Sequence, residues 1–153
     1  MIAVGKAAPA FALAADDGST IALKDLKGRP VVLYFYPADD TPTCTKEACE
    51  FRDAFPQFKK SKAVILGVSP DTVASHAKFK KKYKLPFTLL ADEGHAVADK
   101  YGVWEKKKLF GVSYMGVLRT TFLIDAEGIV QHVFPVKRLA GHIDQVEQAL
   151  KGL

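Results

Sequence analysis

Two cysteines five positions apart, Cys44 and Cys49, are the residues of this sequence best suited to covalent chemistry. Thr41 followed by Pro42 is typical of a helix start, because Thr can accept a hydrogen bond from a free backbone N–H and Pro lacks one. Cys44 then lies in the first helical turn, where the helix dipole and free N–H groups favour thiolate over thiol. The thiolate is nucleophilic, so Cys44 is a candidate nucleophile. The alternative is a small buried hydrophobic residue, the common role of a free cysteine.

The other groups able to bind a metal do not form a recognisable site in the sequence. The four histidines are scattered along the chain, at His76, His95, His132 and His142. Neither Cys-x-x-Cys nor His-x-x-x-His spacing occurs. We therefore expect no metal and no cofactor. Two cysteines are also too few for the disulfide scaffold of a small secreted protein.

Length and composition indicate an ordinary globular protein. The 153 residues, of which 48% are hydrophobic and 25% charged, predict one domain over residues 1–153. No apolar run approaches the roughly 20 residues that cross a bilayer, and the opening residues lack the basic start of a signal peptide. The expectation is a cytoplasmic protein without a membrane partner.

The net charge of +5 raises the possibility of nucleic-acid binding, but the placement of the lysines argues against it. In the lysine-rich run 78–84 the apolar residues Phe79 and Tyr83 are four apart, as on one face of a helix. The lysines then form a solvated face, and Lys106 to Lys108 are expected in an exposed loop. We expect no nucleic-acid partner, although the basic charge can steer an anionic substrate or an acidic protein.

The hydrophobic patterns predict an α/β fold. Residues 31–36 are apolar at every position, as in a strand buried on both faces within a sheet covered by helices. The other expected elements are a hairpin over 11–23 turning at Asp17-Gly18, a helix over 41–60 that Pro56 kinks or breaks, a strand over 63–69, a helix over 70–83, a strand over 87–90, a helix over 95–101 that Gly102 ends, a hairpin of 120–124 and 129–134, and a helix over 141–150. Residues 103–116 show no clear periodicity and are expected to be irregular. The Cys44 segment therefore leaves the carboxyl end of a buried strand, where sites of α/β sheets lie.

The arrangement Pro37-x-x-x-Thr41-x-x-Cys44 resembles the signature of the peroxiredoxins, thiol peroxidases that reduce hydroperoxides with a cysteine. The continuation to Cys49 is similar to their Q branch, the bacterioferritin comigratory proteins, whose resolving cysteine often lies five residues on. Residues 119–125 and 5–11 also resemble family segments, so the similarity spans nearly the whole chain. It implies a thioredoxin-like fold, with a mixed central sheet, helices on both faces and an N-terminal hairpin.

The resemblance also implies roles for individual residues. Cys44 would attack the peroxide O–O bond and become a sulfenic acid, and Cys49 would resolve it to a disulfide. Arg119 would hold the thiolate and polarise the peroxide, since aimed donors lower the barrier where negative charge develops. Thr41 would offer its hydroxyl to the peroxide. The alternatives are a surface ion pair for Arg119 and a plain N-cap for Thr41.

Three further residues are implied to support the site. Pro37 would shield Cys44, and Glu47 would orient the arginine. Their alternatives are a strand-ending proline and an exposed helix residue. Thr43 is a departure, because this branch commonly has Gly there, and its side chain could narrow access beside Cys44 and alter the peroxide preference.

The partners implied are a hydroperoxide and thioredoxin or a similar dithiol reductant, in a monomeric protein of antioxidant defence. Two other functions stay open. A thiol–disulfide oxidoreductase of the same fold would use Cys-x-x-Cys, absent here, and a Pro where this chain has Thr120. A non-enzymatic binding protein would carry the two cysteines incidentally.

Overall fold

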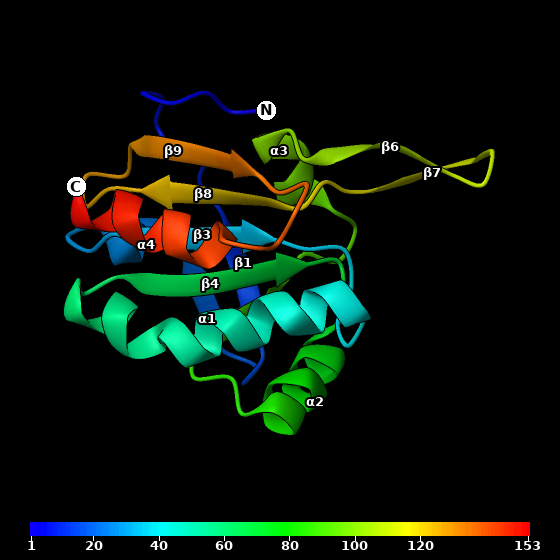
Figure 1. Cartoon of the computed structure of the whole chain (residues 1–153), viewed down its shortest axis with the longest axis horizontal. Coiled ribbons are helices and arrows are strands. Elements are labelled where there is room, and N and C mark those ends of the chain that lie inside the picture. The colour runs from blue at the N-terminus through cyan, green and yellow to red at the C-terminus, as the bar shows by residue number, and fades with distance from the viewer.

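A central seven-stranded sheet organises the structure, a computed structural model that describes residues 1–153 (Figure 1). In chain order the elements are β1 (Ala12–Ala15), β2 (Thr20–Ala22), the 3-10 helix η1 (Leu23–Leu26), β3 (Val31–Phe35), α1 (Pro42–Lys60), β4 (Val64–Ser69), α2 (Val73–Tyr83), β5 (Thr88–Ala91), α3 (Ala96–Tyr101), β6 (Trp104–Leu109), β7 (Val112–Val117), β8 (Thr120–Ile124), β9 (Val130–Pro135) and α4 (His142–Lys151).

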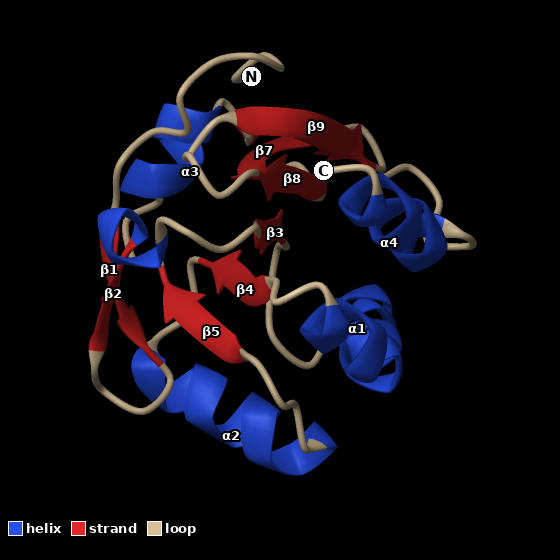
Figure 2. Cartoon of the chain, turned by 90° about the vertical axis from the view of Figure 1, so that its left-hand side faces the viewer, coloured by secondary structure: helices blue, strands red, loops and turns tan.

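The sheet has the strand order β2-β1-β5-β4-β3-β8-β9. Its middle strands β5, β4 and β3 are parallel, and antiparallel hairpins flank them on both sides. Helices α1 and α4 lie on one face, and α3 lies on the other (Figure 2). The α/β class, the mixed sheet, the helices on both faces and the N-terminal hairpin are all confirmed.

Strand β3 shows why its sequence is apolar throughout. All of its residues are buried, and alternate side chains enter two separate hydrophobic cores. Val32 and Tyr34, followed by Tyr36, pack with α1 and α4, whereas Val31, Leu33 and Phe35 pack with α3 and the N-terminal segment. Side chains of a strand alternate between faces, so two covered faces require an uninterrupted apolar run.

Residues 103–116 are not irregular, as the sequence suggested. Strands β6 and β7 form a separate two-stranded hairpin that projects from the body (Figure 1). Both turn residues, Phe110 and Gly111, have positive φ, as is typical of hairpins whose loop has two residues. Lys106 to Lys108 therefore lie in a strand and not in a loop. The hairpin is largely exposed on both faces, so no apolar alternation marks its strands.

Two details of the helices differ from expectation. Helix α1 ends at Lys60 as expected, but Pro56 does not break it. Proline removes one backbone hydrogen bond, and the burial of Phe51 and Phe58 on either side outweighs that loss. Helix α2 begins at Val73 and not at Pro70, because the Thr72 hydroxyl caps it by accepting from the backbone N–H of Ser75 at 3.1 Å.

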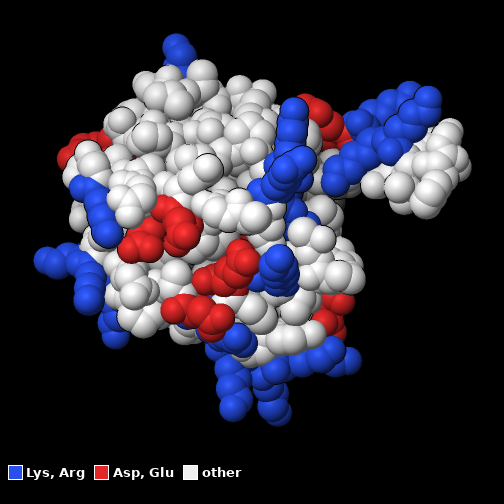
Figure 3. Space-filling view, in the orientation of Figure 1, with Lys and Arg blue, Asp and Glu red and all other residues white.

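The charged side chains follow the expected pattern on α2. Phe79 is buried and Tyr83 half-buried, while Lys78, Lys81 and Lys82 are exposed. Figure 3 shows basic groups along the projecting hairpin and at the α2 edge, with acidic groups between them. None of the helices combines the length and the apolar character needed to cross a membrane.

Candidate active site

Cys44 lies at the start of α1, as the sequence predicted. Thr41 is the residue before the helix, Pro42 opens it, and Cys44 is the third helical residue, with only 2% of its surface exposed. The expected cap by the Thr41 side chain is wrong. Its hydroxyl instead donates to the carbonyl oxygen of Ala38 at 2.9 Å, within the loop of residues 37–41, called here the active-site loop.

Arg119 contacts the Cys44 sulfur directly. Its Nη2 donates to Sγ at 3.1 Å, and its Nη1 donates to Glu47 Oε1 at 2.6 Å. Strand pairing explains the meeting: β8 runs antiparallel to β3 with Thr120 opposite Phe35, so the residue before β8 lies beside the carboxyl end of β3. A surface ion pair is therefore the wrong description of Arg119, whose side chain is 13% exposed.

Glu47 is fully buried, so the alternative of an exposed helix residue is wrong. One carboxylate oxygen is paired with Arg119, but Oε2 has no hydrogen-bond partner. Burial raises the pKa of Glu47 to about 7, although the nearby Arg119 acts in the opposite direction. A buried carboxylate with one unpaired oxygen disfavours the charged form. The site therefore holds a carboxyl group that titrates near neutral pH beside the thiol.

His142, at the start of α4, lies behind Glu47. Its Nε2 is 4.0 Å from Glu47 Oε2 and 2.9 Å from the hydroxyl oxygen of Thr121. Burial, reinforced by Arg119, lowers the pKa of His142 to about 4. No role for His142 or Thr121 could be predicted from the sequence, because neither belongs to the motif around Cys44 and only the tertiary packing of α4 brings His142 to Glu47 and Thr121.

Glu47 and His142 predict opposite pH dependences of stability. As pH rises from 4.5 to 7, the unfolded chain loses the Glu47 proton before the folded chain does, so this group destabilises the fold by about 3 kcal/mol. As pH falls from 6.5 to 4, the unfolded chain protonates His142 first, so stability is lost in that direction. The two effects offset each other in the native protein.

Single variants separate these two effects. When the pH is raised from 4.5 to 6.5, the unfolding free energy of Glu47→Gln is expected to change by about 2–3 kcal/mol more in the stabilising direction than that of the wild type. The unfolding free energy of His142→Gln is expected to change by a similar amount in the destabilising direction. Urea unfolding at the two pH values measures both. Parallel pH dependences in the wild type and both variants would contradict the prediction.

The remaining predicted residues surround this centre. Pro37 is half-buried just beyond β3, and Thr43 is exposed within regular helix, so its side chain leaves the backbone there undisturbed. Cys49 is partly exposed on α1, and both thiols are free. Lys107, which was expected in a loop and lies in β6, also approaches the site. Burial, and then Arg119, lower its pKa, while Cys44 opposes them.

Only Asp39, Asp71 and His76 group as possible metal ligands, with their ligand atoms within 4.8 Å of one another. These atoms already have hydrogen-bond partners. Asp71 Oδ2 accepts from the backbone N–H of Asp39 and from the Ser69 hydroxyl, and Asp39 Oδ2 lies 2.7 Å from His76 Nδ1. The cluster is therefore satisfied without an ion.

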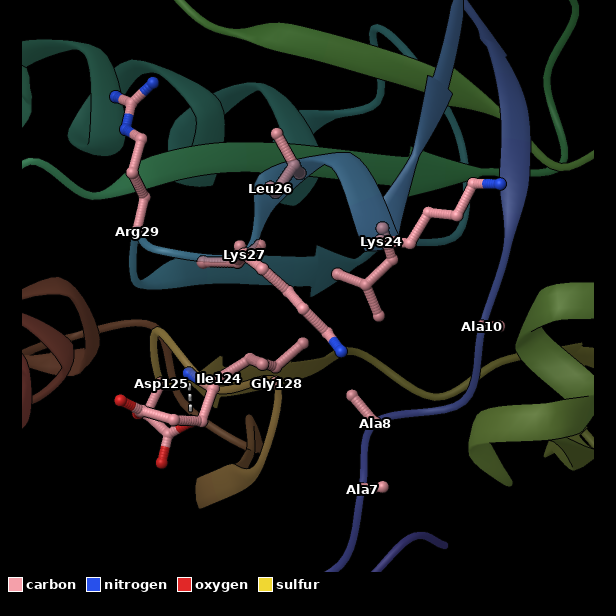
Figure 4. A pocket seen from close by; sticks show the side chains of 13 residues that line it. Ala7, Ala8, Ala10, Lys24, Leu26, Lys27, Arg29, Ile124, Asp125 and Gly128 are labelled. Carbon is pink, nitrogen blue, oxygen red and sulfur yellow. Dashed lines mark hydrogen bonds between the residues drawn. The ribbon is translucent and has the colours of Figure 1, made fainter.

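A pocket of about 230 Å³ lies between the N-terminal segment, η1 and the turn joining β8 to β9 (Figure 4). It is lined by Val31 at the start of β3 and by Ile124 at the end of β8. Cys44 follows the opposite end of β3, so this pocket is separate from the thiol site.

Comparisons with known proteins agree with this geometry. The AhpC/TSA family matches residues 4–133. Peroxiredoxin Bcp of Bacillus subtilis (strain 168) is 47% identical over 152 residues, which cover 99% of this chain and 97% of that protein. The bacterioferritin comigratory protein of Xanthomonas campestris has a TM-score of 0.88 at 37% identity, covering 93% of this chain and 90% of the other. A mutant of Xylella fastidiosa PrxQ has a TM-score of 0.92 at 30% identity, covering 99% and 97%.

These relatives share the mixed, helix-covered sheet over almost their full length, which confirms the thioredoxin-like fold. The family match contains both cysteines and Arg119. Proteins named peroxiredoxin are thiol peroxidases, so neither a disulfide oxidoreductase nor a non-enzymatic binding protein is supported. The chain belongs to the AhpC/TSA family, among the Bcp and peroxiredoxin Q proteins, and is a thiol peroxidase.

Proposed function

We propose that the chain reduces hydrogen peroxide and organic hydroperoxides through Cys44, with Cys49 as the resolving thiol. The Cys44 thiolate attacks one peroxide oxygen, the O–O bond breaks, and the departing alkoxide or hydroxide takes up a proton. The resulting sulfenic acid reacts with the Cys49 thiol to give a disulfide and water. A thioredoxin-type dithiol then reduces the disulfide and is itself oxidised. The observation that carries this proposal is the Arg119 N–H aimed at the Cys44 sulfur at 3.1 Å.

The residues around the thiol support this reaction. Arg119 stabilises negative charge on sulfur and on the departing oxygen, and Glu47 holds its guanidinium through the 2.6 Å bond. The Thr41 hydroxyl donates to Ala38, which leaves its oxygen lone pairs available to accept from a peroxide O–H. Pro37 is half-buried at the start of the active-site loop, which supports a role in limiting water at the sulfur.

The proposed range of peroxides rests on a relative and on the residue that precedes Cys44. The Xanthomonas campestris relative is described through its alkyl peroxide reduction activity. Thr43 is exposed and precedes Cys44 at the start of α1, which supports a role for its side chain in access to the sulfur. We therefore propose that both hydrogen peroxide and alkyl hydroperoxides react, and that Thr43 tunes the ratio of their rates.

Arg119→Lys is expected to slow the reaction with peroxide by at least about tenfold, roughly 1.4 kcal/mol of barrier. A lysine cannot supply two donors in a fixed plane, so it cannot contact Glu47 and Cys44 together as Arg119 does. The second-order rate constant for loss of the Cys44 thiol measures the effect. An unchanged constant would place Arg119 outside the reaction.

The proposal also covers the setting of the enzyme. We expect the whole chain to act as one domain and as a monomer in antioxidant defence. Reduction of the proposed Cys44–Cys49 disulfide by a dithiol requires a reducing compartment, which favours the cytoplasm. Sedimentation of reduced and oxidised protein tests the monomer, since the β6–β7 hairpin exposes apolar side chains on which a dimer could form: Leu109, Phe110, Val112, Tyr114 and Met115.

A direct assay tests the proposed function. Reduced protein is mixed with hydrogen peroxide, and residual thiol or the fluorescence of Trp104 is followed. Loss of both thiols is expected, that of Cys44 in the reaction with peroxide and that of Cys49 as the disulfide forms. Steady turnover is expected only when thioredoxin, its reductase and NADPH are present. Absence of rapid thiol loss would overturn the peroxidase assignment, and turnover with another dithiol only would overturn the choice of reductant.

A further inference from the structure

A buried polar cluster holds the active-site loop on the β4 side of β3, and Arg119 lies on the opposite side, next to β8. Its centre is the Asp39 side chain, which is only 4% exposed. Oδ1 accepts from the Tyr36 hydroxyl at 2.6 Å, and Oδ2 accepts from the Ser75 hydroxyl at 2.8 Å. His76, with no exposed side-chain surface, places Nδ1 2.7 Å from the same Oδ2.

The cluster ties the loop to three other elements. The backbone N–H of Asp39 donates to Asp71 Oδ2 at 2.8 Å, and Ser69, the last residue of β4, donates to the same oxygen at 2.5 Å. His76 Nε2 donates to the carbonyl oxygen of Leu90 in β5 at 2.9 Å. One aspartate therefore links the loop to the ends of β4 and β5 and to the first turn of α2.

The next residue, Asp40, shows what these bonds hold in place. Its φ is 54°, a left-handed conformation that is uncommon for a residue other than glycine. Its carboxylate accepts from Lys82 Nζ at 2.7 Å and from the Tyr83 hydroxyl at 2.8 Å, both on α2. Such a backbone conformation persists only where the surroundings hold it, and the bonds to Asp39 and Asp40 provide this support.

Asp40 is the last loop residue whose side chain is hydrogen-bonded to another element. The side chain of Thr41 bonds only within the loop, to Ala38. In the first turns of α1, the side chains of Cys44 and Glu47 are hydrogen-bonded to another element, and in both cases the donor is Arg119. The loop is thus fixed to other elements up to Asp40, whereas the side-chain hydrogen bonds that join the first turns of α1 to other elements all involve Arg119.

We propose that Asp39 and His76 are positioning residues that hold the active-site loop in its peroxide-reactive conformation and set the boundary at which the start of α1 can open. The inference rests on the proposed function of Cys44 and Cys49. The physical reason is that Thr41 and Cys44 follow the left-handed turn at Asp40 by one and four residues, so any change of that turn moves the hydroxyl and the sulfur relative to Arg119. Opening for the second step requires only residues beyond the turn.

Four variants test the positioning role by removing increasing parts of the hydrogen-bonded cluster around Asp39: Tyr36→Phe, Asp39→Asn, Asp39→Ala and His76→Gln. Tyr36→Phe removes one hydroxyl and keeps the buried ring. The matched control is Asp99→Asn, which breaks an exposed His95–Asp99 pair of the same 2.7 Å length on α3, away from the loop. Circular dichroism first shows that each variant is folded at the assay temperature.

Two rate constants are then measured by quenched-flow mass spectrometry: the reaction of Cys44 with hydrogen peroxide and the conversion of its sulfenic acid to the disulfide. Asp39→Ala and His76→Gln are expected to slow the first at least tenfold and to change the second less than threefold. Tyr36→Phe should slow the first about threefold, Asp39→Asn should fall between Asp39→Ala and the wild type, and Asp99→Asn should match the wild type. Amide exchange should accelerate at residues 37–41 of the reduced variants.

Equal losses in both steps would indicate a general loss of structure and overturn the inference. So would a first step within twofold of the wild type in folded Asp39→Ala or His76→Gln. If these two do not fold, an unchanged first step in Tyr36→Phe refutes the inference. A wild-type protein that fails to react with peroxide would refute the proposed function and this inference with it. A reactive wild type beside equally reactive variants would refute the inference alone.

Discussion

Replacement of Cys44 by Ser is expected to abolish peroxidase turnover, with a loss of at least about 10³-fold, or roughly 4 kcal/mol of barrier. A serine hydroxyl does not ionise near neutral pH and cannot form a sulfenic acid. The fold should be retained, because serine is similar in size to the buried cysteine and can accept the Arg119 hydrogen bond in its place. Peroxide consumption with a thioredoxin system measures the loss.

Cys49→Ser is the matched control for this prediction, because both residues lie on α1 and only one is the proposed nucleophile. It should keep the reaction with peroxide and accumulate sulfenic acid at Cys44, detected by mass after one equivalent of peroxide. It should also lose recycling by thioredoxin. Substantial turnover in Cys44→Ser, or an unreacted Cys44 thiol in Cys49→Ser, would contradict the order of the two roles.

Oxidation of Cys44 is expected to unwind α1 locally, over about residues 41–50. Both cysteines lie on one uninterrupted helix. Five residues of helix rise about 7.5 Å and rotate near 140° on a radius of about 2.3 Å, so the two Cα atoms stand roughly 8.5–9 Å apart. A disulfide spans at most about 7 Å between Cα atoms. The bridge therefore requires the first turns to open.

The structure indicates what opposes this opening and what helps it. Unwinding removes Cys44, Glu47 and Ala48 from a core in which each is at most 2% exposed, and it breaks both contacts of Arg119. Opening also returns the Glu47 carboxylate to water, and burial has raised its pKa to about 7. Charged Glu47 is therefore released more easily above pH 7. Between pH 6 and pH 8, the rate of disulfide formation should rise more in the wild type than in Glu47→Gln, which lacks this carboxylate.

Amide hydrogen exchange on the reduced and oxidised protein measures the opening. Protection of residues 44–50 should fall on oxidation, while the rest of α1, held by the buried Phe51 and Phe58, should remain protected. Loss of protection throughout α1 would point to a larger rearrangement. Equal protection in both states, without an intramolecular disulfide by mass, would falsify the unwinding and indicate that an outside thiol resolves the sulfenic acid.

The sequence by itself determined those parts of the protein that depend on local physics. A fully apolar run between prolines specified β3, since only a strand covered on both faces needs such a run. Thr41-Pro42 located the start of α1 and so placed Cys44 in its first turn. The similarity of residues 37–49 and 119–125 to the peroxiredoxins indicated the chemistry, because the motif carries the reactive groups themselves.

Only the tertiary structure decided which groups surround the thiol. Arg119 reaches Cys44 because β8 pairs with β3, and the burial of Glu47 and its contact with His142 depend on α4 packing against α1. No local pattern records such contacts, since they join residues far apart in the chain. The same holds for the links of Asp39 to α2 and β5. The β6–β7 hairpin escaped prediction for the opposite reason: strands exposed on both faces need no apolar alternation, so burial leaves no periodic signal in their sequence.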